Sequence, residues 1–97
     1  MNPAKVRRDR LFLLTDLPNI GPAMARDLRL LGFERPEQLA GQDPQALYDR
    51  LCLLTGVRQD PCVLDVLKSV TRFMDGDDPR PWWFYTPERK RSVLAKE

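Results

Sequence analysis

The stretch LTDLPNIGPAMARDLRLLGF, residues 14–33, decides how this chain folds. It predicts one helix end, a short turn and a second helix that begins at Gly21-Pro22, because a proline at the first helical position has no N–H group left unpaired. Ile20 would fill the gap between the two helices, Gly21 would permit a sharp turn, and small Ala25 would let the helices approach closely. The first amides of the second helix would then face outward, where the helix dipole favours an anion.

The spacing Leu-x-x-Ile-Gly-x-x-x-Ala-x-x-Leu in this stretch resembles the helix-hairpin-helix motif, whose turn presents backbone N–H groups to a DNA phosphate. Asn19 stands where the motif commonly has glycine, and Pro22, Ala23 and Met24 stand where it often has a lysine or arginine. Two interpretations stay open: the turn holds a phosphate, or it only packs two helices together. The candidate phosphate-binding residues are Asn19, Gly21, Ala23, Met24, Arg26 and Arg29.

Prolines, aspartates and glycines divide the remaining chain into helical segments. A weaker second unit has a helical turn near residues 36–40, a turn at Gly41 to Pro44 and then a helix. The apolar stripe over residues 61–74 is the most continuous one, so that helix should be central. The aromatic segment 79–85 should be an extended strap over the core. We expect helices over residues 9–16, 22–31, 44–55, 61–74 and 87–95.

No segment shows the alternation of a half-buried strand, so the predicted fold class is all-α. We expect a compact bundle of about five to six short helices. Its core would be tandem and helix-hairpin-helix-like, with a degenerate second hairpin, followed by the aromatic strap and a last helix. Residues 1–8 are predicted to form a flexible basic arm, and residues 9–97 a single domain.

Composition excludes several classes of function. The chain has 97 residues, a formal charge of only +2 and no histidine, the commonest general base and metal ligand. It shows no convergent polar set, so we expect no enzyme, no metal and no cofactor. No apolar run could span a membrane and no secretory signal is evident, which indicates a cytoplasmic protein. Cys52 and Cys62 could pair only if their helices bring them together.

Two further features allow alternative interpretations. Basic residues crowd both ends of the chain and could clamp a nucleic-acid backbone or simply be solvated. Four adjacent aromatic residues, 82–85, could stack on bases or cover the core, which is the preferred interpretation. Carboxylates such as Asp60 invite a metal interpretation, but a helix N-cap explains Asp60 better. The accessory basic candidates are Arg7, Arg8, Arg89, Lys90 and Arg91.

Four blocks, LPNIGPAMARDLRLLGF, QLAGQDPQALYDRLC, GVRQDPCVLDVL and PWWFYTPERK, resemble a small bacterial family known as the pathogenicity-locus proteins. The resemblance implies a tandem helix-hairpin-helix-like fold and association with DNA. We therefore expect a non-enzymatic, sequence-independent module that binds double- or single-stranded DNA weakly and in a salt-dependent way. The alternative is a protein-interaction adaptor that uses the aromatic strap or the edge formed by Leu30, Leu31 and Phe33.

Overall fold

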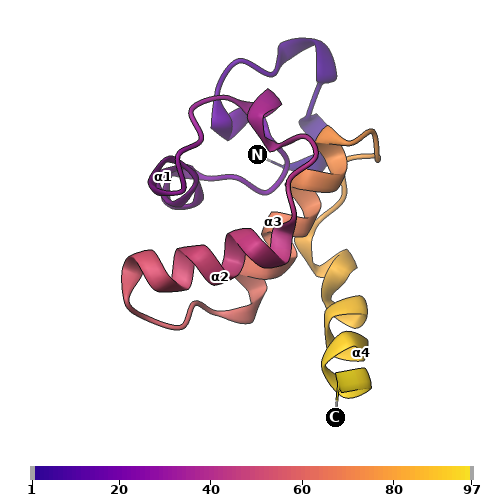
Figure 1. Cartoon of the computed structure of the whole chain (residues 1–97). Helices are drawn as coiled ribbons and strands as arrows, with labels where there is room; N and C mark the ends of the chain where they lie inside the picture. Colours follow the sequence, from indigo (N-terminus) through magenta and orange to yellow (C-terminus); the bar gives the residue numbers. More distant parts are fainter. Residues whose placement is uncertain (1, 97) are drawn as a thin grey trace.

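Four α-helices and several single turns of 3-10 helix make up the described chain (Figure 1). The computed structural model describes the backbone of residues 2–96 and the side chains of residues 2–91, so Met1 and Glu97, the outer ends of the predicted arm and domain, lie outside it. No strand occurs within residues 2–96, which confirms the all-α class, but the four α-helices are fewer than the five to six predicted. The α-helices are α1 (Pro22–Leu30), α2 (Pro44–Thr55), α3 (Pro61–Met74) and α4 (Thr86–Lys96). The 3-10 turns are η1 (Pro3–Lys5), η2 (Arg8–Arg10), η3 (Leu14–Asp16), η4 (Pro36–Leu39) and η5 (Trp82–Tyr85).

The starts of α1, α2 and α3 agree with the sequence prediction. Each helix has a proline at its first position, where the missing N–H group costs nothing. The Asp43 carboxylate accepts a hydrogen bond from the amide of Gln45 at 3.0 Å, and the Asp60 carboxylate accepts one from the amide of Cys62 at 2.9 Å. These aspartates are therefore the helix caps that the sequence indicates.

Gly32 ends α1 in a left-handed conformation with φ of 99°. The amide of Gly32 donates to the carbonyl of Arg29, and the amide of Phe33 donates to the carbonyl of Leu28, both at 2.9 Å. This pair of bonds is the Schellman arrangement, in which glycine avoids the strain that a Cβ atom would bring. The turn directs Phe33 into the core, where it is buried together with Leu31. The predicted exposed edge of Leu30, Leu31 and Phe33 is therefore wrong for two of its three members.

The predicted helix over residues 9–16 is also wrong. Two separate 3-10 turns, η2 and η3, occupy this span, and Leu13 between them is extended. The Asp16 carboxylate accepts the amides of Phe12 at 2.9 Å and Leu13 at 2.8 Å, which a continuous helix would use internally. With Pro18 close behind, the segment is too short to repay helix nucleation.

The aromatic segment differs from the prediction of an extended strap. Trp82–Tyr85 forms the 3-10 turn η5, which continues directly into α4 at Thr86. Pro79 and Pro81 precede this turn, and residues 82–86 contain no proline, so each of them has an N–H donor. Accordingly, the amide of Phe84 donates to the carbonyl of Pro81 at 3.0 Å.

Helix α3 is the central packing element, as its apolar stripe predicts. It contacts α2, α4, η4 and η5, and residues 64–71 and Phe73 are all buried. Helix α2 contacts α3 directly, and α1 contacts both η3 and α2, so residues of the first hairpin and of α2 belong to the same buried cluster as those of α3. The fully enclosed apolar side chains of this core are Leu14, Leu17, Ile20, Leu28, Leu31, Leu39, Leu51, Leu67, Val70 and Phe73.

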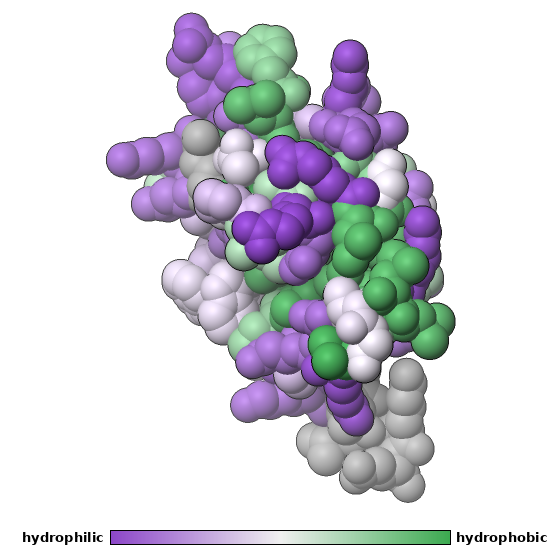
Figure 2. Space-filling view, turned by 90° about the vertical axis from the view of Figure 1, so that its left-hand side faces the viewer, coloured by the Kyte–Doolittle hydropathy of each residue, from purple (hydrophilic) through white to green (hydrophobic). Residues whose placement is uncertain are grey.

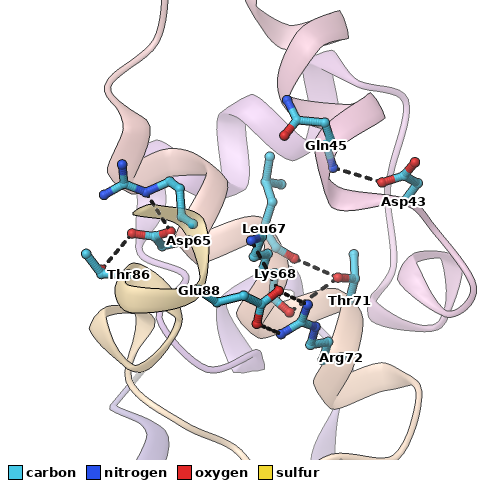
Figure 3. Close-up of polar contacts among 10 residues, drawn as sticks. Asp43, Gln45, Asp65, Leu67, Lys68, Thr71, Arg72, Thr86 and Glu88 are labelled. Atoms are coloured by element: carbon cyan, nitrogen blue, oxygen red, sulfur yellow. Dashed lines mark hydrogen bonds and ion pairs between the residues drawn. The ribbon is translucent and has the colours of Figure 1, made fainter. Parts of the chain in front are cut away.

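Charged side chains fix α4 against α3 (Figure 3). The Asp65 carboxylate has no exposed surface and accepts hydrogen bonds from Thr86 Oγ1 at 2.8 Å and from Arg89 Nε at 3.0 Å. Glu88 lies between Lys68 and Arg72, and the Arg72 guanidinium donates to both of its carboxylate oxygens at 2.6 and 2.7 Å. Arg72 holds the pKa of Glu88 down at about 2.

Candidate nucleic-acid interface

A tight turn connects η3 to α1. The amide of Leu17 donates to the carbonyl of Leu14 at 3.1 Å, and the amide of Ile20 donates to the carbonyl of Leu17 at 3.4 Å. Between them, Asn19 adopts a left-handed backbone with φ of 67°. Asparagine tolerates this conformation better than most residues with a side chain, so it can occupy a position where glycine is common.

The side chain of Asn19 anchors this turn to the rest of the molecule. Its Nδ2 donates to Ser69 Oγ at 2.9 Å and to the carbonyl of Arg80 at 2.8 Å. Sequence reasoning missed both partners, because they lie 50 and 61 residues away along the chain. Although Asn19 is a predicted phosphate-binding residue, its amide group serves the fold, and its contribution to a site is to set the direction of the turn.

The start of α1 presents backbone donors to solvent. Gly21 and Ala23 are exposed, Met24 is half-buried, and Gly21 has no side chain that could cap the helix. Among the described residues, the amides of Gly21, Ala23 and Met24 have no hydrogen-bond partner. A Cβ atom placed on Gly21 would meet nothing within 4 Å. These donors therefore lie at the positive end of the helix dipole, and Gly21 and Ala23 are on the exposed surface.

Arg26 and Arg29 follow on the same helix. They stand three residues apart, so they are neighbours on the surface of α1, and both are exposed. Neither guanidinium has an ion pair or hydrogen bond to any side chain within residues 2–91, although half-buried Asp27 lies between them in sequence. Helix α1 lies on the side that faces the viewer in Figure 2, where hydrophilic side chains stand beside an apolar area.

The N-terminal accessory residues differ in their availability. Arg8 donates to the carbonyls of Phe73, at 2.7 Å, and of Asp77, and its guanidinium lies 4.0 Å from the centre of the Phe73 ring. Arg8 therefore caps the C-terminal end of α3. Arg7 pairs with Asp9 at 3.0 Å on the exposed surface, where such pairs contribute little.

The C-terminal accessory residues divide in the same way. Arg89 is only 17% exposed and is bonded to Asp65, so its charge is neutralised internally. Lys90 and Arg91 are exposed. The structure thus separates the basic residues into those that hold the fold and those that remain accessible to a ligand.

The aromatic residues 82–85 divide between the core and the surface. Tyr85 is buried, and Trp82 is half-buried and packs against the core. In contrast, Trp83 is 61% exposed and Phe84 is 54% exposed. Covering of the core is therefore confirmed for Tyr85 and in part for Trp82.

Cys52 and Cys62 are free thiols, both half-buried. A hydrogen bond to the Asp60 carboxylate raises the pKa of Cys62. The hydrogen bonds that this carboxylate accepts from Cys62 lower the pKa of Asp60. Among the described side chains, no three His, Cys, Asp or Glu residues could share a metal ion.

Within the described residues, no helix combines the length and the apolar character needed to cross a membrane.

The family described as "Cdd1: Pathogenicity locus" matches residues 7–91. A relative from Streptomyces lavendulae, "Mitomycin resistance protein McrB", is 45% identical over 84 residues, which are 87% of this chain and 79% of the relative. No solved structure matches the chain significantly. The family match includes the first hairpin, α1, α2, α3 and the start of α4.

Proposed function

The chain belongs to the pathogenicity-locus family, as its sequence blocks predict, and we propose that it is a non-enzymatic DNA-binding module of the cytoplasm. Its ligand is the sugar–phosphate backbone, and its binding is independent of base sequence. In this proposal, η3, the turn at Asn19 and α1 act as a helix-hairpin-helix unit whose first helix is reduced to a single 3-10 turn.

One observation carries the proposal. The amides of Ala23 and Met24, which have no partner within the described chain, are followed on the same helix by two exposed arginines without carboxylate partners. Beyond a phosphate bound by the amides, Arg26 lies within one turn along α1 and Arg29 within two. Amides fix the position of an anion and arginines add attraction, while neither reads base identity.

A salt titration tests this proposal. We expect weak binding of a labelled duplex, with Kd of about 10⁻⁴ to 10⁻⁶ M near physiological salt. Replacing both residues, Arg26→Ala and Arg29→Ala, removes two phosphate contacts and should make the slope of log K against log salt shallower by about 1.8. An unchanged slope, or no binding of duplex or single-stranded DNA at low salt, would remove the hairpin from consideration.

The relative adds a cellular expectation. Its printed name reports mitomycin resistance, and the shared region covers most of both chains. If this region acts alike in the two proteins, expression of the present chain raises the mitomycin concentration that cells tolerate. The variant with Arg26→Glu and Arg29→Glu should lose that effect, whereas equal protection by both forms would separate resistance from the hairpin.

A second candidate function is binding to a protein partner, with the hairpin as scaffold only. Leu53, at 84% exposed, lies near Leu54 and Val57, which are also exposed, at the end of α2. A hollow of about 560 Å³ beside them includes Leu53 and Val57 in its lining. A protein recovered with the chain after nuclease treatment, and lost with Leu53→Ser and Val57→Ser, would favour this candidate.

A further inference from the structure

A hollow of about 620 Å³ opens between η5, α4 and the start of α3. Trp82, Trp83 and Pro87 supply apolar walls, and Lys90 and Cys62 also line it. Its volume lies within the range of small-molecule sites. The hollow is separate from the amides of α1, and nothing in the proposed phosphate site uses it.

The two tryptophans form a corner in this hollow. Their ring centroids are 5.7 Å apart and their planes meet at 83°, so the edge of one ring faces the other. Trp82 is half-buried and anchored on the core, while Trp83 is largely exposed. A flat ring could stack on one indole while its edge touches the other.

Trp83 differs from its neighbour Phe84 in how its ring is covered. The Arg80 guanidinium lies 4.4 Å from the centre of the Phe84 ring and covers one of its faces. Within the described side chains, the ring contact of Trp83 is the perpendicular one with Trp82, and no cation lies over it. Because Trp83 is largely exposed and lines the hollow, its ring is accessible for stacking there.

The charges around the hollow favour an anionic ligand. Lys90 is exposed and has no ion pair among the described residues, whereas the charge of Arg89 is balanced by Asp65. The raised pKa of Cys62 keeps this thiol neutral near pH 7. The nearby Asp60 carboxylate already accepts the amide of Cys62. A flat aromatic group that carries a phosphate matches this combination of an indole face and a free ammonium.

From this geometry we propose that the hollow binds one unpaired nucleotide of single-stranded DNA, with its base stacked on Trp83 and a phosphate beside Lys90. The inference deepens the proposed function and rests on DNA being the partner. A base inside a duplex is stacked on both faces and cannot reach Trp83, so the site selects single-stranded segments. Asn19 links the two sites, since its side chain bonds to the carbonyl of Arg80, two residues before Trp82.

The chain provides its own probe for this site. It contains two tryptophans, and both line the hollow, so tryptophan fluorescence reports on its occupancy directly. Titration with oligothymidylate should quench the fluorescence. An oligomer of the same length and charge with abasic sugars in place of thymidines should bind more weakly and quench little.

Matched variants identify the stacking residue. Trp83→Ala should weaken the binding of labelled oligothymidylate about tenfold and leave duplex affinity within twofold. Trp83→Phe keeps an aromatic face and should restore part of the loss. Phe84→Ala, at a neighbouring position of similar exposure, should change neither affinity by more than twofold. Circular dichroism confirms that each variant is folded.

Failure of this inference can be told apart from failure of the proposed function. Equal binding of the abasic oligomer, or an unchanged oligothymidylate affinity in Trp83→Ala, overturns the nucleotide site while duplex binding through Arg26 and Arg29 can still stand. Conversely, quenching that persists when Arg26→Glu and Arg29→Glu leave duplex binding unchanged supports the nucleotide site and overturns the hairpin. Wild-type protein that binds neither form of DNA overturns both.

Discussion

Two pairs of arginines in this protein have opposite surroundings. Arg26 and Arg29 on α1 are exposed and have no carboxylate partner within the described side chains. Arg72 and Arg89 sit at the junction of α3 and α4 and bond to Glu88 and Asp65 respectively. The same side chain thus occurs in one region as an accessible charge and in the other as part of the internal structure.

The difference teaches which charges a ligand can use. The Asp65 carboxylate is fully buried, so removing its arginine would leave a charge without compensation in the interior. The arginines of α1 compensate nothing inside the protein, and water or a phosphate can solvate them equally. We therefore expect the junction to control stability and α1 to control binding, and the following measurements test that division.

The largest expected effect on stability comes from Arg89→Ala. It leaves the buried Asp65 carboxylate with Thr86 as its remaining side-chain donor and should lower the free energy of unfolding by about 3 kcal/mol. Urea denaturation followed by circular dichroism measures this loss. The paired replacement Asp65→Leu with Arg89→Leu should lose less than Arg89→Ala alone. A loss below about 0.5 kcal/mol for Arg89→Ala would show that the junction is not what holds α4.

The next largest effect on stability is expected at Asn19, whose side chain connects the first hairpin to Ser69 of α3 and to Arg80. Asn19→Ala removes two side-chain hydrogen bonds and puts a Cβ-bearing residue of lower tolerance at φ of 67°, so we expect a loss of about 2 kcal/mol. Asn19→Gly keeps the left-handed backbone and removes only the bonds, so its loss should be smaller. Equal losses in thermal or urea unfolding would mean that the backbone conformation carries no strain.

Acid should weaken the junction in a defined pH range. The pKa of Glu88 falls from 4.5 to about 2 in the folded chain, mainly through its bonds from Arg72. Stability from this carboxylate is therefore complete above about pH 4.5 and is lost as pH falls toward 2. Glu88 and Arg72 are each more than a third exposed, so solvent limits the contribution to about 1 kcal/mol. Glu88→Gln should flatten the stability profile between those pH values, and a profile parallel to wild type would exclude this pair as its source.

A smaller change tests how completely the junction satisfies its polar groups. Tyr85 lies there with its ring under Arg72, and its buried hydroxyl has no hydrogen-bond partner within the described chain. Tyr85→Phe removes that unsatisfied group and should raise the free energy of unfolding by about 0.5 kcal/mol. A loss of 1 kcal/mol or more in urea denaturation would reveal a bond to this hydroxyl.

The sequence predicts features that depend on near neighbours. The starts of α1, α2 and α3 follow from prolines with a glycine or aspartate just before them, and these are local signals. The junction could not be predicted, because Asp65 and Arg89 are separated by 24 residues and meet only after α4 has docked. The apolar spacing over residues 9–16 misled because it fits isolated 3-10 turns as well as a helix.

The candidate site divides along the same line. The open amides of α1 and the exposure of Arg26 and Arg29 follow from the helix start and the apolar stripe. Arg8 caps α3 through the carbonyls of Phe73 and Asp77, which are distant in sequence. The sequence therefore predicted Arg8 as an accessory basic residue for DNA and could not show this role. Whether these open groups bind DNA stays a prediction.

The most direct test compares two charge reversals in one DNA titration at low salt. Arg26→Glu with Arg29→Glu alters α1, and Arg35→Glu with Arg58→Glu alters exposed positions outside it. Each replacement removes two charge units, so both double variants change the formal charge from +2 to −2. We predict that the α1 variant loses duplex binding at least tenfold more than the control, with both proteins folded. Equal losses would mean that overall charge, rather than the hairpin, attracts DNA, and would contradict the account.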